Sequence, residues 1–189
     1  MSINFTGIPV DKTTITKRAS IFKNNSIQAY IVELDKNNFE DMNALRDTAF
    51  KWYDNGGRYA PNIYNKAVDK YKFNDISKEH FYALTTQQKD FEKIKPDNIL
   101  GLMMFSETKN FDNEINYLEV DPATSKSKNL IREYKKVGSR LVEFIKKTYN
   151  KKSIFVQADS RAIKFYKKMG FFQLSKDTME RACQMYFRR

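Results

Sequence analysis

The sequence predicts a single α/β domain in which helices flank a central sheet. Three observations predict it: two strand-like runs joined by a turn in the middle of the chain, a strand–helix–strand unit near the C-terminus, and amphipathic helical patterns between further strand-like runs. The chain has 189 residues and is 41% hydrophobic, so one domain can bury a sizeable core. No internal repeat, low-complexity segment or linker divides it.

The polar N-terminal segment, residues 1–25, is expected to form a partly flexible lead or an extra strand, and the domain proper is expected to span residues 26–189. Alternating apolar residues predict a strand over residues 27–34. Asn37 or Asn38 can then cap a helix, because a short side-chain oxygen accepts hydrogen bonds from the unpaired N–H groups of a first turn. One face of this helix carries Phe39, Met42, Leu45, Ala49 and Trp52.

A second helix is predicted after the glycine-containing stop at residues 54–57. Pro61 suits its first turn, because proline lacks the N–H group that this position leaves unpaired. Residues 81–86 are a predicted strand. The apolar face of the second helix holds Tyr64, Ala67 and Tyr71.

Residues 99–106 and 115–120 are strand-like runs, and the turn-like residues 111–114 lie between them. This arrangement predicts an antiparallel hairpin, which Asp121-Pro122 closes. The polar residues 123–129 are expected to form a loop.

A further helix is predicted after the segment from Glu133 to Ser139. The alternative is one continuous amphipathic helix over residues 130–149, since Leu130 and Tyr134 keep the same helical spacing. The apolar side of the predicted helix carries Val137, Leu141, Phe144, Ile145 and Thr148.

The C-terminal unit begins with a predicted strand over residues 153–158. Asp159 or Ser160 can cap the helix that follows, and Gly170 supplies the left-handed residue that ends it. Phe171 and Phe172 then open another strand. The apolar stripe of this helix consists of Ala162, Phe165, Tyr166 and Met169.

The charge of the chain is unevenly distributed. Residues 123–189 hold 18 Lys/Arg and 5 Asp/Glu, a net charge of +13, whereas residues 1–122 hold 16 and 18, a net charge of −2. A basic half predicts a polyanionic ligand, either a nucleic acid or a phosphate-bearing coenzyme. The plainer alternative is that the lysines decorate solvated helix faces.

Several classes of protein are not favoured by the sequence. The single cysteine, Cys183, excludes an intramolecular disulfide and fits a reducing compartment, so a cytoplasmic location is expected. Cys183 falls in a predicted late strand, residues 181–187, and is expected to be a core residue. His80 is the one histidine, so no His/Cys metal site is expected. The chain shows neither a signal-peptide pattern nor an apolar run of membrane-spanning length.

The C-terminal unit resembles a motif of the GNAT superfamily of N-acetyltransferases: Asn, two residues, Ala, three residues, Tyr and then Gly-Phe. Ala162, Tyr166, Gly170 and Phe171 match this pattern, and Asp159 stands where the family prefers Asn. The order of the elements from Ile99 to the C-terminus is also similar to that of the family. The resemblance implies a GNAT-like, mixed and mostly antiparallel central sheet flanked by helices in one α/β (α+β) domain.

The segment from Glu133 to Ser139 resembles the GNAT loop Gln/Arg-x-x-Gly-x-Gly/Ala, which wraps the pyrophosphate of coenzyme A. Gly138 matches the last position, but Glu133 replaces Gln/Arg and Lys136 replaces the middle glycine. Lys136 denies the loop some backbone freedom and brings a cation. The loop therefore either binds coenzyme A along a modified path or has lost this role.

The resemblance implies acetyl-CoA as a co-substrate and direct attack of an amine on its acetyl group. Tyr166 matches the residue that protonates the departing thiolate. Glu119 is the first candidate for the base that deprotonates the amine, and Glu107 is the second. No metal is expected. The implied cofactor-binding residues are Leu118, Val120, Glu133, Tyr134, Lys135, Lys136, Val137, Gly138, Ser139, Asp159 and Ala162.

The implied acceptor is an amine, on a small molecule or a peptide, and Tyr59 and Pro61 with the neighbouring glycines are expected to form a wall of its site. No membrane partner is expected, and a homodimer stays open. Two other functions remain: a GNAT-like binding module without catalysis, and a basic nucleic-acid-binding protein. The last rests on the basic half and its aromatic residues alone, and no recognised nucleic-acid motif supports it.

Overall fold

The computed structural model describes residues 8–19, 23–69, 77–109, 111–124, 133–174 and 182–188. Within these ranges one sheet carries four α-helices. The helices are α1 (Phe39–Asp54), α2 (Ala60–Val68), α3 (Val137–Thr148) and α4 (Ile163–Lys168). The strands are β1 (Ile8–Arg18), β2 (Asn24–Leu34), β3 (Ser77–Thr85), β4 (Ile99–Thr108), β5 (Asn113–Val120), β6 (Tyr134–Lys135), β7 (Ile154–Asp159), β8 (Phe172–Gln173) and β9 (Ala182–Phe187).

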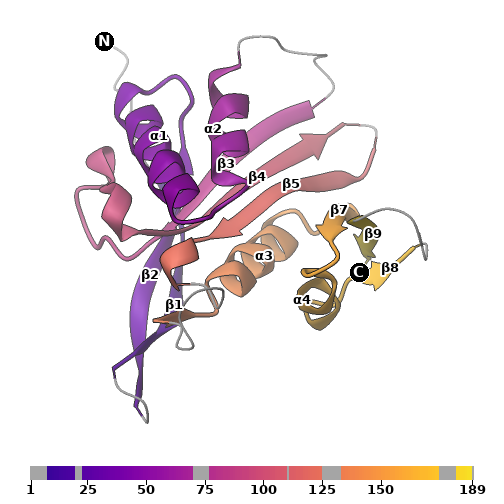
Figure 1. Cartoon of the computed structure of the whole chain (residues 1–189). Helices are drawn as coiled ribbons and strands as arrows, with labels where there is room; N and C mark the ends of the chain where they lie inside the picture. Colours follow the sequence, from indigo (N-terminus) through magenta and orange to yellow (C-terminus); the bar gives the residue numbers. More distant parts are fainter. Residues whose placement is uncertain are drawn as a thin grey trace.

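The sheet is mixed and mostly antiparallel, as the sequence predicts. Its strand order is β6-β1-β2-β3-β4-β5-β7-β9-β8, and β5 and β7 form its parallel pair. Helices α1 and α2 lie on one face and α3 and α4 on the other (Figure 1). Each face therefore has a core of its own.

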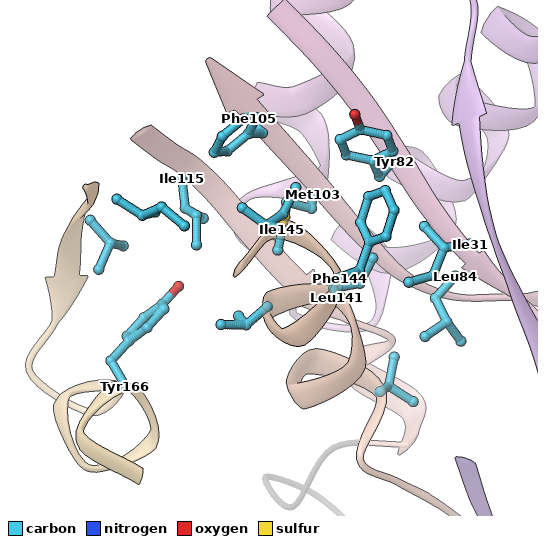
Figure 2. Close-up of a cluster of buried hydrophobic side chains, with 14 of the residues drawn as sticks. Ile31, Tyr82, Leu84, Met103, Phe105, Ile115, Leu141, Phe144, Ile145 and Tyr166 are labelled. Carbon is cyan, nitrogen blue, oxygen red and sulfur yellow. The ribbon is translucent and has the colours of Figure 1, made fainter. Parts of the chain in front are cut away.

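The core on the α3 side draws residues from β2, β3, β4, β5, β7 and β9 as well as from α3 and α4. Figure 2 shows part of it, with Leu141 and Phe144 of α3 facing Leu84 and Met103 of the sheet. The core on the other face packs α1 and α2 against β2, β3 and β4, around the fully buried Trp52.

Helix α1 begins as expected, because Asn38 accepts hydrogen bonds from the backbone N–H groups of Glu40 (2.9 Å) and Asp41 (3.1 Å). The expected apolar face was wrong at Phe39, whose side chain is 75% exposed. At about 100° per residue, Phe39 lies roughly a third of a turn away from the buried Leu45.

The start of the chain contributes a full strand to the sheet. β1 pairs with β2 along its whole length, so the expected domain boundary between residues 25 and 26 falls inside β2. Residues 1–7 and 20–22 lie outside the described residues. At its far end β1 also pairs with β6, where Thr16 faces Lys135 and Lys17 faces Tyr134.

The predicted hairpin is confirmed, since β4 and β5 pair antiparallel. A β-bulge interrupts the pairing, because Met104 faces Tyr117 and Phe105 faces Ile115, which leaves Asn116 as the extra residue. The bulge turns Ile115 toward the α3 core and Tyr117 toward the α1–α2 core.

The segment before α3 decides between the two sequence hypotheses. Helix α3 begins at Val137, and Lys136 has φ +70°, in the left-handed region. The continuous helix is therefore wrong, because a helix cannot pass through a left-handed residue. Residues 125–132, which hold most of the expected polar loop, are outside the described residues.

The C-terminal unit has the expected strand, helix and left-handed Gly170, with φ +85°. The expected cap was wrong: α4 begins at Ile163, after Ala162, without a side-chain cap. The Asp159 carboxylate instead accepts a hydrogen bond from the backbone N–H of Arg161 (3.0 Å), ahead of the helix. The predicted apolar face of α2 can be compared with the structure as far as Ala67, since Tyr71 lies outside the described residues.

The remaining expectations concern single side chains. Cys183 is buried in the α3-side core, as predicted. His80 is buried, with Nδ1 2.6 Å from Oε1 of Glu33 and Nε2 3.5 Å from Oε2 of Glu107. Across the described ranges, no group of His, Cys, Asp and Glu is arranged to hold a metal ion. None of the helices seen there has both the length and the apolar character that a membrane span requires.

Candidate active site

The sheet opens between β5 and β7. Their parallel pairing covers residues 113–115 of β5 and 154–156 of β7. Beyond it, β7 continues alongside β9, while residues 116–120 of β5 have no ladder partner on this side among the described strands. Two cavities occupy the region where the strands diverge, and they share the lining residues Leu118, Ala162 and Tyr166.

The first cavity, here called the loop cavity, has a volume of about 300 Å³. It lies between the end of β5, the segment that leads into α3, and α4. Most of the residues that the sequence predicts for a coenzyme lie on its wall. The lining residues are Leu118, Val120, Tyr134, Lys136, Val137, Gly138, Ser139, Ala162, Phe165 and Tyr166.

The N-terminus of α3 lies at the wall of this cavity. No side chain caps the helix, and Val137, Gly138 and Ser139 of the first turn line the wall. The unpaired backbone N–H groups of an uncapped helix N-terminus, with the positive end of the helix dipole, favour an anion. The absence of a side chain at Gly101 allows the start of α3 to pack directly on β4, because a Cβ at Gly101 would be 2.7 Å from Cγ1 of Val137.

The second cavity, here called the sheet cavity, has a volume of about 730 Å³. It lies over β3, β4 and β5 and is bounded by α2 and β7. Of the residues expected to form a wall of the acceptor site, Tyr59 lines this cavity, whereas Pro61 and the neighbouring glycines do not. Its other lining residues are Lys66, Glu79, Met104, Ser106, Thr108, Glu114, Ile115, Asn116, Tyr117, Leu118, Val156, Gln157, Ala158, Asp159, Ala162 and Tyr166.

Tyr166 joins the two cavities. Its side chain is 5% exposed and it lines both, together with Leu118 and Ala162. Its hydroxyl has no hydrogen-bond partner among the residues described, and it points from α4 toward the side of the sheet that carries Ile115 (Figure 2). Burial raises the pKa of Tyr166 above its ordinary value of 10.0, and the nearby Tyr59 adds to the rise.

Helix α4, which carries Tyr166, is fixed from two sides. The rings of Phe165 and Phe171 contact Tyr166 edge-on, at centroid distances of 5.0 and 5.3 Å. Lys146 of α3 donates a hydrogen bond to the carbonyl oxygen of Met169 (2.7 Å) at the end of α4. The phenol is therefore held in one position at the junction of the cavities.

Three of the predicted cofactor residues do not line the loop cavity. Glu133 faces β1, with its carboxylate 3.6 Å from Nζ of Lys17, and Lys135 belongs to the strand that pairs with β1. Asp159 lines the sheet cavity instead. Its hydrogen bonds from Arg161 lower its pKa to about 2, so it is ionised at neutral pH.

Glu119 lies away from both cavities. Its carboxylate accepts hydrogen bonds from the backbone N–H groups of Arg58 (2.7 Å), Tyr59 (3.0 Å) and Ala60 (2.7 Å). It therefore caps the N-terminus of α2 from β5, which positions Tyr59. Glu107 lies beside His80 and also lines neither cavity. We therefore propose structural roles for both in place of the base.

Glu119→Gln is expected to lower the free energy of unfolding by about 1–3 kcal/mol, because an amide cannot accept all three backbone hydrogen bonds. Urea unfolding measures this loss. The exposed Glu92→Gln is the control and should leave stability unchanged. If Glu119→Gln instead keeps wild-type stability but loses turnover about 10²-fold or more, Glu119 is the base after all.

Lys136→Gly is expected to raise the free energy of unfolding by about 1–2 kcal/mol, because glycine adopts a positive φ without strain. Lys136→Ala keeps the strain and should leave stability nearly unchanged. Both variants lose the cation, so equal weakening of coenzyme A binding in calorimetry would assign the effect to charge. Unchanged stability in Lys136→Gly would contradict the strain argument.

The sequence reasoning missed the polar residues of the sheet cavity. The sequence pattern predicts no element at Glu79 and a turn at Glu114, whereas the structure places them in β3 and β5. One feature of the sequence could have indicated this polar site. The apolar run of β4 ends in the small polar residues Ser106 and Thr108. Phe165, predicted as a core residue, also lines the loop cavity.

The chain has the fold of the GNAT superfamily of N-acetyltransferases. PaiA N-acetyltransferase from Thermoplasma acidophilum, solved with coenzyme A, superposes with a TM-score of 0.53 at 18% identity, over 85% of this chain and 99% of that one. An acyl-CoA N-acyltransferase from Pseudomonas aeruginosa gives 0.53 at 11% identity, over 85% and 99%. ElaA from Escherichia coli gives 0.51 at 14%, over 84% and 99%. No protein-family model and no curated protein sequence matches the chain.

Proposed function

We propose that this protein is an acyl-CoA-dependent N-acyltransferase that moves an acetyl group from acetyl-CoA to an amine by direct attack. The observation that carries the proposal is the junction of two cavities at one buried phenol without a hydrogen-bond partner among the described residues. One cavity suits a phosphate-bearing coenzyme, and the other is open to a second substrate. The GNAT fold supports this assignment.

The residues of the loop cavity fit coenzyme A. The uncapped first turn of α3 offers backbone N–H groups to its pyrophosphate, and Lys136 adds a cation beside them. The free edge of β5 at Leu118 and Val120 offers backbone groups to the pantetheine arm, as an added strand would use them. Lys136 adopts the left-handed conformation that a glycine would adopt, so the altered loop sequence retains a bent backbone.

The proposed role of Tyr166 follows from its position and its raised pKa. Bound acetyl-CoA supplies a thioester, whose acyl carbon an amine attacks while the carbon–sulfur bond breaks. Tyr166 donates the proton of its hydroxyl to the departing sulfur, and the resulting phenolate takes up a proton from water before the next turnover. Its raised pKa keeps the phenol protonated until that moment.

The acceptor amine must lose a proton as the amide forms. Two carboxylates that the sequence analysis names for this site are already committed, since Glu119 caps α2 and Asp159 is paired with Arg161. We infer that this proton passes to water in the sheet cavity. The enzyme then depends on the fraction of acceptor that is already neutral.

The rate constant kcat/KM should therefore rise with pH. An alkylamine has a pKa of about 10.4, so its neutral fraction grows about tenfold per pH unit between pH 7 and 9. The pKa of Tyr166 is raised, so its protonated form persists across this range and adds no falling limb. Initial rates of thiol release in this interval measure the profile. A fall above pH 8 would contradict the assignment of Tyr166 as the acid.

The decisive experiment is a titration of the protein with acetyl-CoA, followed by a screen of amines for thiol release. At about one hundred times the dissociation constant, ligand should stabilise the fold by roughly 2.7 kcal/mol, a rise of several degrees in Tm. Binding without transfer to any amine would indicate a non-catalytic module. No heat and no thermal shift at millimolar acetyl-CoA would overturn the proposed function.

A further inference from the structure

The sheet cavity holds two carboxylates that no cation of the described residues neutralises. Glu79 of β3 and Glu114 of β5 line it, and neither forms an ion pair with a described residue. Lys66 of α2, also on the wall, is exposed to solvent and makes no ion pair with them. The negative charge is notable in a chain with a net charge of +11.

The two glutamates flank a short residue in one row of the sheet. Glu79 pairs with Ser106 on β4, and Ser106 pairs in turn with Glu114 on β5. Two strand spacings put the glutamate backbones about 10 Å apart, with the serine between them. The Ser106 hydroxyl is turned to Asn116, whose Oδ1 accepts its hydrogen bond at 2.7 Å. The row therefore leaves room for a small group between two carboxylates.

Partial burial strengthens the attraction between this row of residues and a bound cation. Glu114 is partly buried, and desolvation raises its pKa because no positive charge offsets it. Asp159, at the other end of the cavity, has its charge offset by Arg161, with Nε 3.0 Å from Oδ1. A cation that enters the cavity thus gains most at the row of Glu79 and Glu114.

The other end of the same cavity marks where the chemistry takes place. Tyr166 is 5% exposed, lines the cavity and has no hydrogen-bond partner among the residues described. Leu118, which lies beside it, is four residues from Glu114, about 13 Å along an extended strand and somewhat less across the bulge. A volume of about 730 Å³ suits a small molecule that reaches from one end to the other.

We propose that the acceptor is a linear aliphatic amine with a second cationic group. Its reacting nitrogen lies at Tyr166, and its distal ammonium lies between Glu79 and Glu114. This inference rests on the proposed function. It names the substrate class that the sheet cavity selects, and it assigns the two glutamates to recognition, with no part in the chemical step.

The test compares two acceptors of equal length, 1,8-diaminooctane and 8-amino-1-octanol, which differ in the distal charge. With acetyl-CoA, kcat/KM should favour the diamine by at least about tenfold, through KM. Glu114→Gln and Glu79→Gln should each remove most of this preference, by raising KM for the diamine more than KM for the amino alcohol. The exposed Glu92→Gln is the matched control and should keep the preference. A shorter diamine, 1,3-diaminopropane, should gain nothing over 3-amino-1-propanol.

The outcomes separate this inference from the proposed function. Turnover with equal kcat/KM for both acceptors would keep the N-acyltransferase and overturn the diamine site. A preference that survives in both glutamine variants would also overturn it. Calorimetry of 1,8-diaminooctane with the protein alone gives an independent readout. Binding that weakens in Glu114→Gln, without any turnover, would support the diamine site and overturn the proposed function.

Discussion

Tyr166→Phe is expected to lower kcat by about 10²-fold or more while coenzyme A affinity changes little, because the variant loses the proton donor and keeps the ring. kcat and kcat/KM should fall together, since the interaction strengthens as the sulfur gains charge. Stability should not fall, because the hydroxyl has no partner among the described residues and the ring contacts with Phe165 and Phe171 persist. Steady-state kinetics and urea unfolding measure both effects.

The control for this variant is a second tyrosine, the partly buried Tyr149, in the variant Tyr149→Phe. The Tyr149 and Tyr82 hydroxyls lie 2.7 Å apart, so removing one leaves the other without its partner and should cost about 1–3 kcal/mol of stability. Turnover should stay at the wild-type level, since Tyr149 lines neither cavity. If a folded Tyr166→Phe turns over like the wild type, Tyr166 is a core residue and the proposed acid lies elsewhere.

Gly138→Leu is expected to weaken coenzyme A binding by about 10–100-fold, because its side chain would enter the loop cavity and the cost of overpacking is roughly 1–3 kcal/mol. A Cβ at Gly138 lies 3.4 Å from Cγ2 of Val120 and 3.5 Å from Cζ of Phe165, on the two walls of the cavity. Calorimetric titration measures the loss. Thermal unfolding should show an intact fold, since leucine favours a helix more than glycine does.

Gly138→Ala is the matched control. Its single added carbon makes ordinary contacts at these distances, so affinity should stay close to the wild-type value. Wild-type affinity in Gly138→Leu would show that coenzyme A does not occupy the loop cavity. Equal weakening in both variants would point to the backbone of α3 rather than to the volume of the cavity.

Most of the elements could be predicted from the sequence, because their signals are local. The cap at Asn38, the proline in the first turn of α2, the hairpin of β4 and β5, and the left-handed Gly170 depend on nearest neighbours along the chain. The resemblance of the C-terminal unit also placed Tyr166 beside the loop that leads into α3. These residues come together because consecutive elements pack against one another.

The choice of polar side chains in the site could not be predicted from the sequence, because it depends on contacts between distant parts of the chain. Glu119 caps α2 because the N-terminus of this helix, about 60 residues earlier in the chain, lies against β5. Glu79 and Glu114 share a row because two strand registers align them through Ser106, and a bulge at Asn116 sets which residues of β5 face the cavity. An alternating pattern gives the two faces of a strand, but register with distant strands selects the neighbours, and that register is fixed by the packing of the whole sheet.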